Sequence, residues 1–444
     1  MSAQDPGLAF SAGTALPHVS ARRAWTVLGI VVASHAVVFL DKALLGLTAQ
    51  PLMRELGLSK AEFGSISGAS YLLFGVTCLI AGYVADRFSV RWVLLACGVM
   101  WALGQIPAIF AVSGAMLYLS RVAVGAAEGP AQPLSHVAAY SWFPNERRGL
   151  PAALITCGTS IGKFALVPLV ALIIAQFGWH AAFVTVGLLA LVWSGLWLAW
   201  GRLGPYGDTK ASATKVTSVT STASVTEGGS GPAVSWWRIV LSGTFIGSFA
   251  AVFTQGALAA VIFTWLPSYF HEGLGFSTTT AGTLFTVPSA MAIVSLLCVG
   301  PITDMLLRKG VPSRLARGVF GGCCLIASGL MLMLLYWVSS PVLAIVVLTL
   351  GYGLSTTVNV IANPSLAEIT PVAKRARALS ALVALGSLAG VTSPIFTGWL
   401  LDIADTQQRG YAEVFLVFGA LVALGGLCFA VLVHPERDRR RVMG

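Results

Sequence analysis

The fold of this 444-residue chain is decided by Gly82-Tyr83-Val84-Ala85-Asp86-Arg87-Phe88-Ser89-Val90-Arg91. A degenerate copy, Gly300-Pro301-Ile302-Thr303-Asp304 followed by Arg308, stands 218 residues further on (82 to 300). Ser59 and Gly64 recur as Ser277 and Gly282 at the same offset. This regular spacing indicates that the chain contains an internal repeat.

A second block of residues repeats further along each half. Pro144, Arg147 and Arg148 correspond to Pro371, Lys374 and Arg375, at an offset of 227 (144 to 371). Two ordered blocks at matching places predict two structurally similar halves, which in a membrane chain is a transporter architecture with the substrate site between the halves.

The composition is that of a polytopic membrane protein. Hydrophobic residues make up 56% of the chain, charged residues only 10%, and the mean hydropathy is +0.83. A soluble domain carries about 25% charged residues. All seven Cys lie in apolar segments without a CxxC pair, so we interpret them as packing residues and expect no metal site.

Twelve apolar runs are long enough to span a bilayer. They cover residues 25–49, 62–85, 92–112, 115–140, 149–176, 179–200, 237–268, 278–302, 315–337, 341–365, 377–400 and 411–433. We therefore predict an all-α protein in which twelve transmembrane helices form two six-helix bundles related by a pseudo-two-fold axis.

Charge sets the expected orientation and the domain boundaries. With a cytoplasmic N-terminus, 21 of the 27 Lys and Arg residues fall on the cytoplasmic side, three fall outside and three lie within the membrane (21 + 3 + 3 = 27). This pattern explains the net charge of +10 without nucleic acid as a partner. The predicted parts are a cytoplasmic tail (1–24), the first bundle (25–203), a linker (204–235), the second bundle (236–434) and a basic cytoplasmic tail (435–444). The linker is expected to be flexible, because 11 of the 22 residues from Thr209 to Ser230 are Ser or Thr.

Five ionisable residues stand inside the apolar runs: Asp41, Lys42, Arg121, Glu128 and Lys163. A charge at the bilayer centre costs about 2.5–3.5 kcal/mol on insertion scales, so intramembrane charges mark functional sites by default. Arg121 and Glu128 are seven residues apart, which places them on one face of a helix about 10 Å apart. Three cations beside two acids suggest a site for an anion with proton-accepting groups; structural salt bridges are the alternative.

The repeated loop resembles the signature of the major facilitator superfamily, and with the twelve spans this resemblance covers residues 20–435. It implies a two-bundle transporter fold in which charged side chains form a gate at the cytoplasmic helix ends. The gate residues would be Gly82, Asp86, Arg87, Arg91, Asp304 and Arg308. A purely topological role of the two arginines is the alternative.

Spans one and four are similar to the anion:cation symporter branch of that family. The similarity lies in Phe39-Leu40-Asp41-Lys42, in Arg121 with Gly125 to Pro133, and in Trp142 to Gly149. It implies that Asp41 and Glu128 are the protonatable acids and that Arg121 lies near the substrate carboxylate. Lys42 stands where the branch more often has Arg, and Lys163 is outside the common pattern.

These features together predict proton-coupled uptake of an organic anion across a bacterial inner membrane by a monomer. The substrate would be a carboxylate, such as a sugar acid, an aromatic acid or a dicarboxylate, and the proton would be the coupling ion, with no further cofactor. Lys42, Arg121 and Lys163 would bind it, with Gln255 and Asn359 supplied by the second half. Lys163 suits a dianion, or it snorkels from a closely packed helix. His35 and His136 are either proton relays or packing histidines.

The composition and the twelve spans also suit three other functions. A drug exporter of the same fold is disfavoured because Gly162 precedes Lys163 and not the Pro that is typical of that group. An enzyme is disfavoured because the sequence lacks a metal-binding cluster and a nucleophile elbow. An anion channel or sensor is disfavoured by the paired acids and the two-half repeat.

Overall fold

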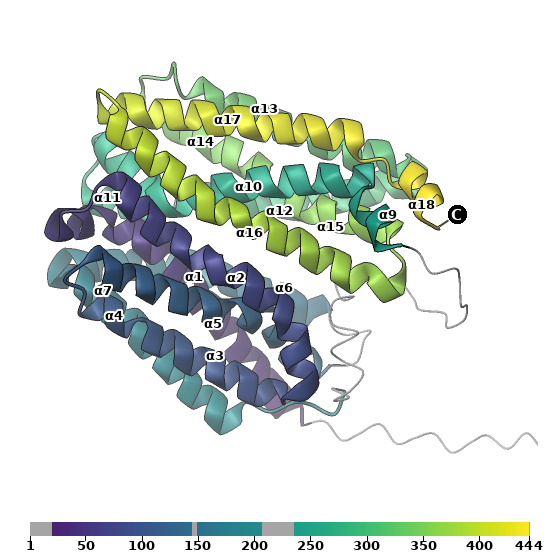
Figure 1. Ribbon diagram of the computed structural model, residues 1–444, viewed down its shortest axis with the longest axis horizontal. Coiled ribbons are helices and arrows are strands. Elements are labelled where there is room, and N and C mark those ends of the chain that lie inside the picture. Colours follow the sequence, from purple (N-terminus) through teal and green to yellow (C-terminus); the bar gives the residue numbers. More distant parts are fainter. Residues whose placement is uncertain (1–19, 144–148, 207–234, 444) are drawn as a thin grey trace, which may run out of the picture.

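The computed structural model describes residues 20–143, 149–206 and 235–443, and these residues are almost entirely helical (Figure 1). The first half contains α1 (Ala21–Leu56), α2 (Lys60–Arg87), α3 (Val90–Gly104), α4 (Ile106–Ile109), α5 (Gly114–Tyr140), α6 (Gly149–Ile161), the π-helix η2 (Gly162–Leu166) and α7 (Val167–Trp200). The second half contains α9 (Trp236–Val240), α10 (Gly243–Ser268), η3 (Tyr269–Gly273), α11 (Thr278–Leu284), α12 (Thr286–Arg308), η4 (Arg314–Val319), α13 (Phe320–Leu334), α14 (Pro341–Ser355), α15 (Val358–Ile369), α16 (Val372–Ile403), α17 (Gln407–Leu432) and α18 (Pro435–Met443).

The helices account for the predicted transmembrane spans. Ten helical stretches in the described residues are long and apolar enough to cross a membrane. One of them, Cys157–Trp200, has 44 residues and is interrupted at Gly178, where φ is 80° and ψ is 173°, so it covers two predicted spans. The 27-residue α5 is not among the ten, and it carries Arg121 and Glu128. With these two adjustments the fold has the twelve spans that the sequence predicts.

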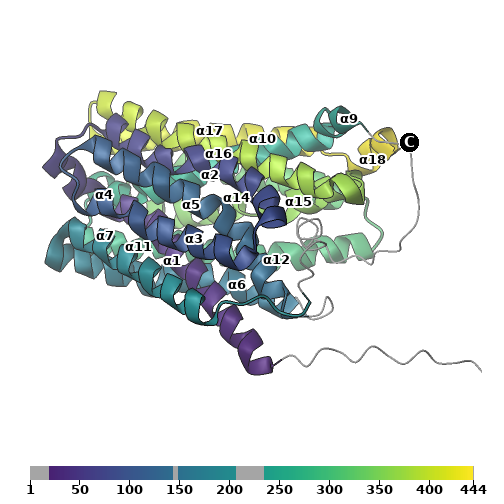
Figure 2. The same ribbon diagram turned by 60° about the horizontal axis from the view of Figure 1, so that its bottom comes forward.

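Two bundles lie side by side with their helices along the long axis of the molecule (Figure 2). Across the join, α2 packs along α16, and α1 packs along α10. The repeated glycines lie at two such contacts. A side chain at Gly64 would collide with the backbone of Pro394 in α16, and one at Gly282 would press on Ala171 in α7. The sequence repeat therefore marks equivalent positions at which the two halves meet.

The repeated serines begin equivalent helices. Ser59 accepts a hydrogen bond from the Glu62 backbone N–H (3.2 Å), while Glu62 Oε2 accepts one from the Ser59 N–H (2.8 Å), which forms a capping box. Ser277 likewise accepts a hydrogen bond from the N–H of Thr280 and begins α11. Such caps satisfy backbone donors that a helix start otherwise leaves unpaired.

We call the end where α1 begins and α17 finishes the terminal end, and the end with the α1–α2 connection the opposite end. At the opposite end Lys60 ties the halves together. Its Nζ lies 3.0 Å from Glu272 Oε2 and contacts Gln407 Oε1. Asp402 of α16 accepts hydrogen bonds from the backbone N–H groups of Lys60 (3.0 Å) and Ala61 (2.8 Å), at the start of α2. The halves are thus joined at this end.

At the terminal end Arg91, Asp304 and Arg308 form no ion pair across the halves among the residues that the structure describes. Arg91 donates to the Leu198 carbonyl within its own bundle (2.8 Å). Asp304 and Arg308 are exposed, and Arg87 is exposed too. Gly82 and Asp86 lie in α2, but their surroundings fall outside the described residues.

The C-terminal tail is more ordered than the sequence predicts. Residues 435–443 form α18, which packs on α15. The buried Asp438 accepts hydrogen bonds from the backbone N–H (2.7 Å) and the hydroxyl (2.8 Å) of Thr244, at the start of α10. Of the predicted N-terminal tail, α1 already includes residues 21–24, and residues 1–19 lie outside the described part. Residues 207–234 of the predicted linker, and Arg147 and Arg148 of the repeat, are also outside it.

Candidate functional site

Two ion pairs connect α1 and α5 in the middle of the first bundle. Asp41 and Lys42 are neighbours on α1, and their partners Arg121 and Glu128 are two turns apart on α5. The sequence predicts that these four residues act together with Lys163, and the structure brings the four together in two ion pairs.

The Asp41–Arg121 pair is sealed from the surroundings. Arg121 Nη1 lies 3.3 Å from Asp41 Oδ2, and only 1% of the Arg121 side chain is exposed. Gln105 completes the pair: its Nε2 donates to Asp41 Oδ1 (2.6 Å), and its Oε1 accepts from Arg121 Nη2. Ser120 Oγ accepts a further hydrogen bond from Arg121 Nη2 (3.0 Å). The Nε of Arg121 is buried without a hydrogen-bond partner among the described residues. The pairing of its other two nitrogens matters because an unpaired buried charge carries a large desolvation cost.

The Lys42–Glu128 pair is looser and partly open. The Lys42 Nζ lies 3.8 Å from Glu128 Oε2, and 28% of the Lys42 side chain is exposed against 4% for Glu128. Lys42 also lies 5.1 Å from the centre of the Phe74 ring, a cation–π distance. The second carboxylate oxygen, Glu128 Oε1, is buried and has no hydrogen-bond partner in the described part of the chain.

Two glycines beside Glu128 position it against α2. A side chain at Gly125 would collide with the carbonyl of Ser70, and one at Gly129 with Thr77 and the carbonyl of Phe74. Without these glycines α5 would stand further from α2, and the Glu128 carboxylate would shift away from Lys42. Small residues allow this backbone approach in membrane helices.

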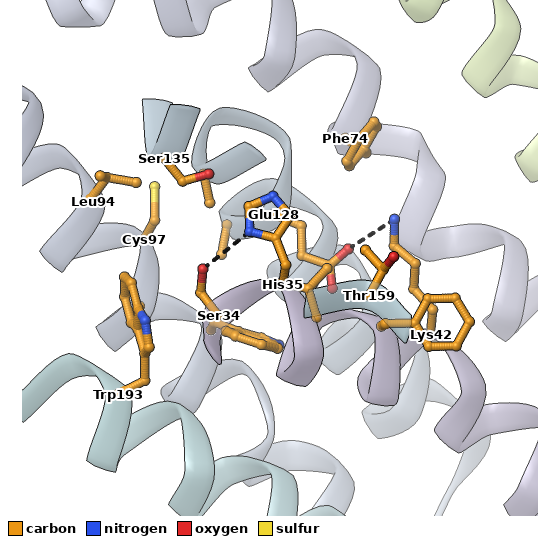
Figure 3. Close-up of a pocket in the computed structure, with 16 residues that line it drawn as sticks. Ser34, His35, Lys42, Phe74, Leu94, Cys97, Glu128, Ser135, Thr159 and Trp193 are labelled. Carbon is orange, nitrogen blue, oxygen red and sulfur yellow. Dashed lines mark hydrogen bonds and ion pairs between the residues drawn. The ribbon is translucent and has the colours of Figure 1, made fainter. Parts of the chain in front are cut away.

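Two pockets border the open pair. The join pocket lies between the halves: Asp41, Lys42, Tyr71 and Glu128 line it from the first bundle, and Phe263 and Thr264 of α10 line it from the second. The bundle pocket, of about 100 Å³, lies within the first bundle and is lined by residues of α1, α2, α3, α5, α6 and α7 (Figure 3). Lys42, Phe74 and Glu128 line both pockets, so the open pair stands where they meet.

Lys163 stands apart from this cluster. It belongs to η2, a π-helical turn, and its Nζ lies 4.6 Å from the centre of the Phe39 ring. It pairs with no carboxylate in the described residues and lines neither pocket. Phe39 lines the bundle pocket and stacks edge-on with Phe263 of the other half (5.3 Å between ring centres). The Phe39 ring therefore lies between Lys163 and the bundle pocket. The π-helical turn is notable because such turns often occur at functional sites.

The other predicted site residues are not gathered here. Gln255 is buried in α10, and Asn359 is exposed at the start of α15. Neither lines the two pockets. Arg121 does not line them either in this conformation, because it lies behind Asp41.

Sequence reasoning missed Gln105 and the hydroxyl groups of the join pocket. Gln105 is fully buried and bridges Asp41 to Arg121. It is an uncharged polar residue inside the apolar run 92–112, and a search restricted to ionisable residues passes over it. Ser67 and Thr264 share a hydrogen bond across the join (2.6 Å), a contact between residues 197 positions apart that only the fold reveals.

Two helical bundles that enclose a charged pocket at their join define a membrane transporter. The chain belongs to the Major Facilitator Superfamily, whose sequence profile matches residues 31–363 and 313–442. Members of this family are transporters, which rules out the enzyme alternative.

Comparison with known proteins agrees with this assignment. The chain is similar to a probable sulfoacetate transporter of Cupriavidus necator (24% identity, covering 92% of this chain and 93% of that protein). It is also similar to a D-galactonate transporter of Escherichia coli (26%, 93% and 96%) and to an efflux pump of Mycolicibacterium smegmatis (25%, 92% and 92%). Its fold resembles the inward-facing, unoccupied crystal structure of a bacterial homologue of the human lysosomal transporter Spinster (TM-score 0.76, 16% identity, 96% and 99%).

Proposed function

We propose that this transporter carries an organic anion together with protons across a bacterial inner membrane by alternating access, and that it works as a monomer. The observation that carries the proposal is the open Lys42–Glu128 pair at the meeting point of the two pockets. Lys42 is a partly exposed cation whose only carboxylate partner among the described residues lies at 3.8 Å. The names of the similar sulfoacetate and galactonate transporters support an acidic substrate.

Anion and proton binding at this pair would be linked by charge. An anion that approaches through the join pocket competes with Glu128 for Lys42. Protonation of Glu128 removes its charge, which frees the Lys42 ammonium to donate charge-assisted hydrogen bonds to the anion. Loss of the proton restores the carboxylate, which draws Lys42 back and expels the substrate.

The Asp41–Arg121 pair stays closed while the anion and Glu128 compete for Lys42. Asp41 and Arg121 hold each other through Gln105, so the anion meets Lys42 first in this conformation. Protonation of Asp41 in a later state would free Arg121, whose guanidinium binds carboxylates through two hydrogen bonds. Lys163 would then add a third cation from the side of η2, which suits a dianion.

The contacts of Lys60 at the opposite end and the distribution of Lys and Arg together suggest which side of the membrane this conformation opens to. By the positive-inside rule both termini would lie in the cytoplasm and the opposite end outside. In that orientation the Lys60–Glu272 contact and the Asp402 hydrogen bonds close the outer side. At the inner side Arg91 bonds to the Leu198 carbonyl of its own bundle, and Asp304 and Arg308 are exposed, so this conformation would release substrate to the cytoplasm.

Glu128→Gln tests the proposed coupling, with Glu413→Gln as the matched control. Glu413 lies at the opposite end, where it pairs with Arg409, and it borders neither pocket. Cells expressing each variant are offered labelled sugar acids, aromatic acids and dicarboxylates, with and without a protonophore. We expect proton-driven accumulation to vanish in Glu128→Gln and to persist in Glu413→Gln. Undiminished protonophore-sensitive uptake by Glu128→Gln would refute the role of Glu128.

An exporter of the same fold is the second candidate, because the Mycolicibacterium smegmatis relative is an efflux pump. The direction in which protons move relative to the anion distinguishes the importer from the exporter. A symporter moves protons in the same direction as the substrate, and an exporter that uses the proton gradient exchanges them. If an acidified vesicle lumen draws the anion inward, the exporter is the better description.

A further inference from the structure

The bundle pocket contains three buried polar atoms that no described protein group satisfies. They are Glu128 Oε1, His35 Nε2 and Trp101 Nε1. Glu128, His35 and Trp101 all line this pocket, and each is at least nine-tenths buried. Unpaired buried polar groups are costly, so three around one pocket indicate that a polar guest bonds to them.

The hydrogen-bonding roles of these atoms can be assigned. His35 Nδ1 lies 3.0 Å from the Val31 carbonyl oxygen, which can only accept, so the neutral ring carries its hydrogen on Nδ1. The other nitrogen, Nε2, is then an acceptor, as is an ionised Glu128 Oε1. Trp101 Nε1 is a donor only. A molecule that donates twice and accepts once fits this set, and water does so.

The size of the pocket agrees with water. Its volume of about 100 Å³ exceeds several times the roughly 10–15 Å³ that one water molecule needs by the same measure, so the pocket has room for more than one water. The pocket also extends from the Lys42–Glu128 pair toward the terminal end. His35 precedes Lys42 by two turns on α1, which places it about 10 Å nearer the terminal end. Ser135 follows Glu128 by two turns on α5 and lines the same part of the pocket (Figure 3).

We propose that the bundle pocket holds a short water chain that conducts protons between Glu128 and His35, separately from the substrate path in the join pocket. A protonated Glu128 gives its proton to the first water of the chain. Each water passes one of its own protons to the next, and the last water passes one to His35 Nε2. This leaves a Glu128 carboxylate and a His35 imidazolium. The imidazolium then releases a proton to water at the terminal end and returns to its neutral form. The inference rests on the proposed proton coupling and adds the route.

The groups around His35 fit a relay. His136 on α5 faces it edge-on with 5.5 Å between ring centres, and Ser34 Oγ lies 3.5 Å from His35 Nδ1. Lys42 on α1, Glu128 on α5 and Cys97 on α3 are the other titratable groups that line the pocket. Histidine can accept a proton on one ring nitrogen and release one from the other, so these neighbours allow His35 to pass a proton on.

The test separates proton release from substrate exchange in reconstituted protein. Counterflow of labelled against unlabelled anion needs no net proton release, whereas accumulation driven by a pH gradient does. For each coupled proton, one pH unit supports about tenfold accumulation. We expect His35→Phe to keep counterflow within about twofold and to lose that tenfold accumulation. Trp101→Phe should slow accumulation in the same manner, and His180→Phe, at the opposite end, should behave like the parent protein.

Two results would overturn the proposal: accumulation by His35→Phe at the parent rate, or an equal loss of counterflow and accumulation. A second measurement does not depend on transport. A high-resolution experimental structure should show ordered water within hydrogen-bond distance of Glu128 Oε1 and His35 Nε2. A dry pocket would refute the water chain even if Glu128 couples protons, whereas a hydrated pocket in a protein that moves no anion would refute only the proposed function.

Discussion

The sealed and open ion pairs use the same kinds of residue on the same two helices, yet they differ in almost every other respect. Asp41 and Arg121 are held by Gln105 and Ser120, and both are nearly inaccessible. Lys42 and Glu128 have fewer protein partners, a longer separation and access to two pockets. On the proposed function, the partners around a charge, more than the charge itself, decide whether a pair supports the fold or takes part in transport.

Breaking the sealed pair should have the largest effect on stability. Arg121→Met leaves the Asp41 carboxylate buried without its cation, and removal of one partner of a buried pair costs about 3–5 kcal/mol. We expect a strong fall in the melting temperature of the purified protein and in its yield. The double variant Asp41→Asn/Arg121→Met should recover part of the loss, since no charge is left unpaired. A melting temperature close to that of the parent for Arg121→Met would show that the pair is not structural.

Breaking the open pair should change transport more than stability. Lys42→Gln removes a charge-assisted hydrogen bond to the anion, worth about 1.5–3 kcal/mol. The KM for the anion should therefore rise about ten- to a hundredfold. Lys42→Arg keeps the charge and should retain most of the affinity. If Lys42→Gln transports with an unchanged KM, the anion does not bind at this pair.

The sequence predicted more of the fold than of the site. Twelve apolar runs and the offset of 218 residues define the two bundles, because the bilayer forces backbone polar groups into helices. The five ionisable residues inside the apolar runs stood out for the same reason. Their pairing could not be predicted, since it depends on which helix faces cross and how closely, as Gly125 and Gly129 show. The partners Gln105 and Thr264 carry no charge, so only the fold reveals them.

Gln105 offers a way to weaken the sealed pair without removing a charge. Gln105→Leu deprives Asp41 of a 2.6 Å hydrogen bond and Arg121 of an acceptor. The loss should reach about 1–3 kcal/mol in the free energy of unfolding, with the KM for the anion altered less than in Lys42→Gln. Chemical denaturation and uptake kinetics measure the two quantities. A larger effect on KM than on stability would place Gln105 in the substrate site.

A carboxylate outside the membrane provides the smallest and simplest comparison. Burial raises the pKa of Asp438, but hydrogen bonds from Arg437 and Thr244 outweigh this and hold the pKa below its usual value. A lowered pKa contributes stability that is present at neutral pH and is lost as the pH falls through the folded-state pKa. Asp438→Asn replaces hydrogen bonds to a charged group with neutral ones, which should cost about 1 kcal/mol at neutral pH. The difference from the parent should shrink in acid. A difference that grows in acid would contradict this assignment.

In the proposed mechanism, anion and proton move together through the Lys42–Glu128 pair. The most direct measurement is the internal pH of proteoliposomes, reported by a trapped dye, when an anion gradient is imposed without a pH gradient. The account predicts that inward anion flux acidifies the lumen in the parent protein and that Glu128→Gln exchanges anion without changing the pH. Anion flux through the parent protein with no change in lumenal pH would contradict it.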